Sequence, residues 1–177
     1  MYDDGDMINP AAKSVLATSA FSLAGIISVL FYSVVSPFLL PHSIIYALLV
    51  LNTYFSIRFW SALQPQDSRQ FLIDAILVLA YLALAFSMGE PAYFAFAAFT
   101  LFALATFKYV LMRGRTPYEA VVERKTGIDA LGALACAALT LGLFLGYALE
   151  ATWLFAIGFA LANVYLLLIK PMYRLSP

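Results

Sequence analysis

Ionisable side chains lie inside apolar stretches of the chain, where a charge is costly and is a functional candidate, among them Asp74, Lys108 and Asp129. The two carboxylates stand near the start of their stretches and the lysine near the end of its own, so each would also complement a helix dipole. Two interpretations are open. In the first, all three lie at the membrane rim, where lysine reaches the headgroups. In the second, they meet on one interior face, as a cluster that binds a charged solute or as a fixed Asp74–Lys108 pair.

A second set of polar side chains lies deeper in the apolar stretches. Asn52 stands near the middle of its stretch, followed by Tyr54 and Arg58, and Asn163 with Tyr165 repeats the pattern near the end of the chain. Because no headgroup reaches that depth, the amides need a partner helix, a water molecule or a ligand. Hydrogen bonds between helices, about 0.6–2 kcal/mol each, are one interpretation. The other is a polar ligand-binding pocket in the half of the membrane nearer the basic residues.

The candidate ligand-binding residues are therefore Asn52, Tyr54, Arg58, Asp74, Lys108, Asp129, Asn163 and Tyr165.

Residues that serve most enzymes and metal sites are scarce. The single histidine, His42, is expected in a solvated outer connection, because one histidine cannot form a zinc site or ligate haem from both sides. A metal site shared with Glu90 and Glu150 is the less favoured alternative. The single cysteine, Cys136, is expected to pack inside the protein. With no phosphate loop, nucleophile elbow or HExxH sequence, we expect no cofactor, no metal and no enzymatic activity.

The elements that position these residues follow from composition. Apolar residues make up 64% of the chain and charged residues 11%, against about half and a quarter in soluble domains. Six apolar stretches run over 14–36, 43–62, 71–88, 92–112, 128–148 and 151–170. A helix of about 20 residues crosses the hydrocarbon core, and the stretches lack the period-two alternation of a membrane barrel. The sequence predicts an all-α integral membrane protein with six transmembrane helices.

The basic residues predict how these helices are threaded. All ten Lys and Arg lie at the termini or around the second and fourth connections, and the other three connections carry none. By the positive-inside rule both termini are expected in the cytoplasm, in a bacterial or archaeal cytoplasmic membrane or an organellar inner membrane. A single domain of three hairpins follows, over 14–62, 71–112 and 128–170. The cytoplasmic link 113–127 is expected to form a short interfacial helix from Thr116 and Pro117.

A weak internal repeat is also visible. The tripeptide Ile-Asp-Ala occurs at 73–75 and again at 128–130, and the same offset aligns Lys108 with Asn163. If the repeat is real, three hairpins of equal orientation would surround a pseudo-threefold axis. Chance alignment of apolar helices is the alternative.

Two functions are compatible with these features. The polar pocket favours a small-solute transporter, permease or channel component, and the alternative is a non-catalytic structural or assembly subunit of a larger membrane complex. The bilayer is the expected partner, together with other membrane subunits in the second case. A net charge of zero gives no electrostatic attraction for nucleic acid.

Overall fold

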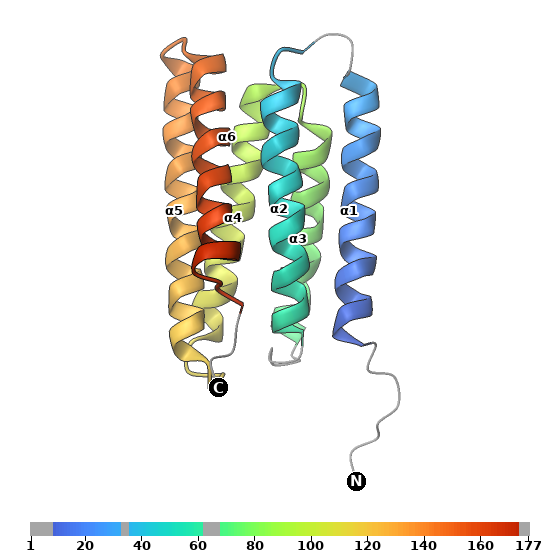
Figure 1. The fold of residues 1–177 in the computed structure, drawn as a ribbon, viewed down its shortest axis with the longest axis vertical. Helices are drawn as coiled ribbons and strands as arrows, with labels where there is room; N and C mark the ends of the chain where they lie inside the picture. The colour runs from blue at the N-terminus through green and yellow to red at the C-terminus, as the bar shows by residue number, and fades with distance from the viewer. Residues whose placement is uncertain (1–8, 33–35, 62–67, 174–177) are drawn as a thin grey trace.

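A computed structural model describes residues 9–32, 36–61 and 68–173 of the chain, and these residues form helices and turns without any strand. The helices are α1 (Pro10–Tyr32), α2 (Leu39–Trp60), α3 (Ser68–Phe86), α4 (Pro91–Met112), α5 (Glu119–Phe144) and α6 (Ala148–Val164), and α6 continues as a π turn, η1 (Tyr165–Ile169) (Figure 1). All six are long and apolar enough to span a membrane, as the sequence predicts. The chain therefore has the helices of a polytopic membrane protein.

The turn between α5 and α6 is set by one glycine. Gly146 has a φ of 86°, a conformation that residues with a Cβ rarely adopt. The amide of Gly146 bonds to the carbonyl of Leu143, and the amide of Tyr147 bonds to that of Gly142. This pair of bonds is the Schellman ending of a helix, which satisfies carbonyls that would otherwise lack partners. It returns α6 alongside α5 after a very short connection.

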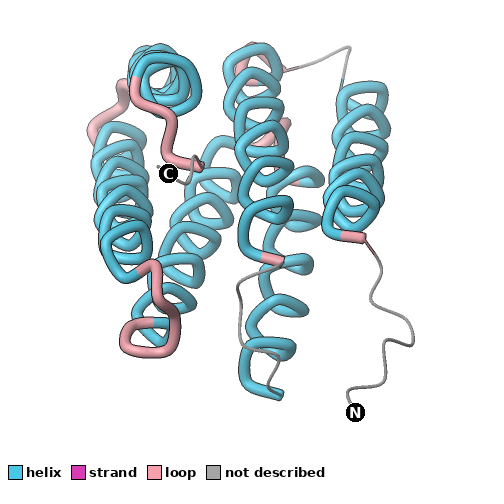
Figure 2. The backbone as a smooth tube through the Cα atoms, turned by 60° about the horizontal axis from the view of Figure 1, so that its bottom comes forward, coloured by secondary structure: helices cyan, strands magenta, loops and turns pink. Residues whose placement is uncertain are grey.

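The helices pack in a ring whose order differs from their order in the chain. Helix α1 packs against α2 and α3, α2 against α6, α6 against α5, α5 against α4, and α4 against α3 (Figure 2). A threefold repeat would make the three junctions between successive hairpins equivalent. Here α1–α3 joins the first helices of two hairpins, and α2–α6 joins the second helices of two hairpins. Only α4–α5 joins the second helix of one hairpin to the first helix of the next. The packing order gives no support to the repeat.

The two ends of the bundle differ in charge. Nine of the ten basic residues lie where α1, α3 and α5 begin and where α2, α4 and η1 end, and Arg174 falls outside the described residues. We call this the basic end. The opposite end, where the α3–α4 and α5–α6 turns lie, is called the far end.

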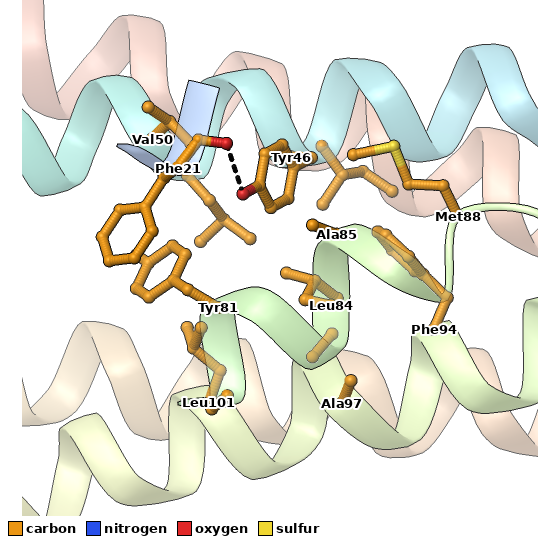
Figure 3. Close-up of a cluster of buried hydrophobic side chains, with 14 of the residues drawn as sticks. Phe21, Tyr46, Val50, Tyr81, Leu84, Ala85, Met88, Phe94, Ala97 and Leu101 are labelled. Carbon is orange, nitrogen blue, oxygen red and sulfur yellow. Dashed lines mark hydrogen bonds between the residues drawn. The ribbon is translucent and has the colours of Figure 1, made fainter. Parts of the chain in front are cut away.

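The apolar core fills the space between α1, α2, α3 and α4 toward the far end. Figure 3 shows the ring of Phe21 stacked on that of Tyr81, with centroids 4.5 Å apart, and the Tyr46 hydroxyl bonded to the Phe21 carbonyl at 2.9 Å. Leu84 and Phe94 are fully buried between these helices. Dense packing of this kind leaves little room for solvent. The far end of these four helices is thus closed.

Side chains from the first part of the chain also hold the α3–α4 turn. Four of them donate to backbone carbonyls at the end of α3 or in the turn that follows it, where carbonyls lack the regular helical partner. The bonds are Ser28 to Ala85 at 2.5 Å, Tyr32 to Phe86 at 3.1 Å, His42 to Met88 at 2.7 Å and Ser36 to Gly89 at 2.9 Å. This group of bonds, the far-end clasp, joins α1 and α2 to the α3–α4 turn.

The expectation of a solvated loop for His42 is wrong. Helix α2 begins at Leu39 and contains Pro41 in its first turn. Proline is tolerated there because the amide hydrogen that it lacks would have no partner within the helix. His42 is therefore helical and fully buried, with its ring stacked on Phe94 at a centroid distance of 3.8 Å. Its Nδ1–H donates to the Met88 carbonyl, since a carbonyl only accepts. The residue is part of the far-end clasp.

Candidate functional site

A cavity of about 1230 Å³ lies between the helices toward the basic end. Ligand pockets commonly measure about 300–1,000 Å³, so this space could hold a sizeable solute. Its lining on α1, α2 and α4 falls within 13–21, 49–61 and 101–109, in the half nearer the basic end, and on α3 it runs over 68–81, past the middle of that helix. Along α5 and α6 the lining continues to Leu139 and Ala151, close to the far end. The cavity is thus bordered by all six helices at the basic end and by α5 and α6 alone where it comes closest to the far end.

Six of the eight candidate residues line this cavity: Asn52, Asp74, Lys108, Asp129, Asn163 and Tyr165. The other two lie elsewhere. Arg58 lines a second hollow of about 450 Å³ between the end of α2 and the C-terminal segment. Tyr54 packs its ring edge-on against Phe55. The structure thus brings the three ionisable residues and both amides together around one space.

Two ion pairs stand in the cavity wall. Lys108 Nζ lies 2.6 Å from Asp74 Oδ1, which joins α4 to α3 as the fixed-pair interpretation predicts. Lys125 Nζ lies 2.5 Å from Asp129 Oδ1 within α5. The first pair is partly open, with 42% of the Asp74 side chain exposed, and the second is closed, with 2% of the Asp129 side chain exposed. Each positive charge is therefore neutralised by a neighbour, and Asp129 is the more strongly desolvated carboxylate.

Lys125 was not among the candidates, because the sequence interpretation placed 113–127 outside the apolar stretch. The structure instead runs α5 without a break from Glu119, so the predicted separate interfacial helix from Thr116 is wrong. Lys125 falls in the second turn of α5, one turn before Asp129, and its ammonium lies 5.5 Å from the centre of the Tyr109 ring. The spacing of four between a lysine and an aspartate was the available signal, since such residues face each other on a helix.

Hydroxyl groups complete the polar part of the wall. The hydroxyls of Ser56 and Tyr109 are 3.1 Å apart, and those of Thr53 and Tyr81 also bond to each other. Beneath them the Tyr173 hydroxyl, from the C-terminal segment, donates to Asn52 Oδ1 at 2.9 Å. Burial raises the pKa of Tyr173, so this hydroxyl keeps its proton and acts as a donor. The C-terminal segment thus contributes to the site.

The wall atoms without a partner among the described residues include two acceptors on almost fully buried side chains. They are Oδ2 of Asp129 and Oδ1 of Asn163, on residues that are 1% and 2% exposed. Asn163 uses its amide nitrogen to donate to the Phe159 carbonyl at 2.9 Å, which leaves its oxygen available. A buried acceptor without a donor costs about 1–3 kcal/mol, so these two atoms are unusual features of the cavity.

Among the described residues no group of three or more His, Cys, Asp or Glu side chains could hold a metal ion. Comparison of the chain with family models, with curated proteins and with solved structures found no match. The cavity and its wall are therefore the features of the molecule that bear on function.

Proposed function

We propose that the protein is a small-solute transporter or permease, without enzymatic activity, whose solute binds in the cavity. The observation that carries the proposal is a cavity of about 1230 Å³ with polar groups at the basic end, beneath a packed core that closes α1 to α4 at the far end. A carrier with its site open toward one side of the membrane has this form, because a solute must reach the site from one side at a time.

The basic end is proposed to face the cytoplasm, in a bacterial or archaeal cytoplasmic membrane or an organellar inner membrane. The described basic residues lie at this end, and the positive-inside rule places such residues on the cytoplasmic side. Both termini would then be cytoplasmic.

The threading can be tested by labelling a single engineered thiol. The native Cys136 is fully buried, so Glu90→Cys in the far-end turn supplies the accessible thiol. A membrane-impermeant maleimide should label Glu90→Cys in intact cells and leave it unlabelled in sealed inside-out vesicles. The opposite pattern would show that the basic end faces outward.

Transport can be tested by filling the cavity. Gly158 lines it, and a Cβ built on this glycine meets no other atom within 4 Å, so Gly158→Leu should project into the cavity without a clash. Gly127 is equally free of neighbours but is not part of the lining, so Gly127→Leu is the matched control.

Proteoliposomes containing each variant would be incubated with a mixture of cell-extracted solutes, and the internal solutes identified by mass spectrometry. We expect at least one solute to enter liposomes that contain the wild type or Gly127→Leu, in which Gly158 is unchanged. The same solute should not enter liposomes that contain Gly158→Leu. Equal uptake by all three proteins, or none above protein-free liposomes, would contradict the proposal. Native mass spectrometry after mild extraction would then test the alternative, since a subunit should emerge with stoichiometric partners.

A further inference from the structure

We infer that the solute is an uncharged amphiphile whose polar end carries at least two hydroxyl groups, which donate to Asp129 Oδ2 and Asn163 Oδ1. This inference rests on the proposed function and specifies the class of solute. It begins from the two buried acceptors without partners among the described residues.

The two acceptors belong to neighbouring helices at the same depth. Helices α5 and α6 pack against each other and are joined by the tight turn at Gly146. Asp129 precedes Gly146 by as many residues as Asn163 follows it, so the two residues stand level on antiparallel helices. Both residues line the cavity. One polar headgroup in the cavity would therefore lie beside both residues, and their two covered oxygens would have to turn toward it.

The charges around the acceptors favour an uncharged headgroup. Lys125 already holds the other oxygen of Asp129 at 2.5 Å, so an ammonium group bound at Oδ2 would stand close to a second cation. An anionic headgroup would face two acceptor oxygens, and the Lys125 ammonium beside them is already bonded to Asp129. Lys108 is engaged by Asp74. A neutral group that donates hydrogen bonds meets neither difficulty.

Hydroxyl groups fit better than amide groups of the same size. A hydroxyl can accept a hydrogen bond as well as donate one. The buried Nε1–H of Trp60 also lines the cavity and has no acceptor among the described residues. A headgroup with several hydroxyls could therefore satisfy acceptors and a donor in the same wall.

The rest of the cavity is suited to an apolar chain. From Asp129 toward the far end, α5 and α6 present small and aliphatic residues to the space, among them Gly132, Ala135, Leu154 and Gly158. The lining reaches Leu139 on α5, about 15 Å beyond Asp129 at 1.5 Å per residue. These residues offer apolar surface to a ligand in the cavity. Where that surface would otherwise contact water, burying it against an apolar chain is favourable at about 25 cal/mol per Å².

The inference can be tested with monoacylglycerol, whose headgroup carries two hydroxyls. Binding of radiolabelled monoacylglycerol to the full-length protein in nanodiscs would be measured, with a fatty acid and an alkylamine of equal chain length as competitors. A short-chain form added from water and a long-chain form incorporated in the bilayer would distinguish a dissolved solute from a membrane lipid. We expect the monoacylglycerol to bind at least tenfold more tightly than either charged competitor. Tighter binding of the amine or the acid would overturn the inference.

A matched pair of variants tests the acceptor directly. Asn163→Leu removes the acceptor together with a hydrogen bond from the side chain to the carbonyl four residues earlier. Thr152→Val is the control, because it removes a similar bond at a buried position that is not part of the cavity lining. We expect Asn163→Leu to weaken monoacylglycerol binding at least tenfold and Thr152→Val to leave it unchanged. Unchanged binding in Asn163→Leu would refute the role of this acceptor. Since the ranking of the three probes uses the wild type, the inference can be refuted even if a variant fails to fold.

Failure of this inference can be separated from failure of the proposed function. If Gly158→Leu blocks uptake of a solute that monoacylglycerol does not displace, transport stands and the assigned class of solute is wrong. If no solute is taken up and no probe binds, both are wrong.

Discussion

Removing Lys125 should destabilise the protein far more than removing Lys108, although each lysine forms one short ion pair. The side chains of Lys125 and Asp129 are 9% and 2% exposed, so Lys125→Met would leave a carboxylate buried without a counter-charge. Breaking a buried pair in this way costs about 3–5 kcal/mol. In the other pair, 42% of the Asp74 side chain is exposed, so water can solvate its carboxylate after Lys108→Met. Exposed pairs contribute about 0–1 kcal/mol.

The double variant Lys125→Met/Asp129→Leu provides the decisive comparison. Replacing both members of a buried pair with apolar residues is often neutral or stabilising, since no charge remains in the interior. We therefore expect the double variant to recover most of the stability lost in Lys125→Met. The measurement is the free energy of unfolding in mixed micelles of mild detergent and dodecyl sulfate, followed by circular dichroism. Equal losses for Lys108→Met and Lys125→Met, or no recovery in the double variant, would refute the reasoning.

Two further predictions concern packing. His42→Phe should keep the stacking on the Phe94 ring but leave the Met88 carbonyl without its buried donor. The free energy of unfolding should fall by about 1–3 kcal/mol in the same micelle assay. No loss would mean that the far-end clasp does not depend on this bond. Gly132→Ala should lower the free energy of unfolding by about 1–3 kcal/mol, because the new Cβ would stand 2.5 Å from the Phe102 ring and overpack the contact. A Cβ at Gly127 would have no neighbour within 4 Å, so Gly127→Ala should be neutral or stabilising by up to about 1 kcal/mol. Similar effects of the two glycine substitutions would contradict the close contact of α4 and α5.

The existence and length of the six helices could be predicted because both follow from local composition. An apolar stretch of about 20 residues has few alternatives in a membrane. The wrong predictions concern the ends of helices, because the sequence does not define precisely where a helix begins. Helix α2 begins before His42 and α5 before Lys125, so one residue expected in a loop is buried in a helix, and one expected outside the bundle lines the cavity.

The order of packing could not be predicted from the sequence. In a water-soluble protein the buried face of a helix is recognised by its apolar residues, but in a membrane the lipid-facing side is equally apolar. Nothing in the composition of α2 therefore indicates that it packs against α6 as well as α1. Polar residues carried more information. Asp74 and Lys108 lie on successive predicted helices, and the fixed pair expected between them is present.

The hydrogen bond from Tyr173 to Asn52 has a consequence for the way the protein is handled. The segment around Tyr173 occupies Asn52, one of the two amides in the cavity wall, so it competes with any guest molecule that would bond to Asn52. Displacing it costs that hydrogen bond, about 0.5–1.5 kcal/mol, together with the packing of Tyr173 against Phe59. Chains shortened before Tyr173, or extended there by a purification tag, would therefore differ from the native chain in affinity, and fusions are better attached ahead of α1.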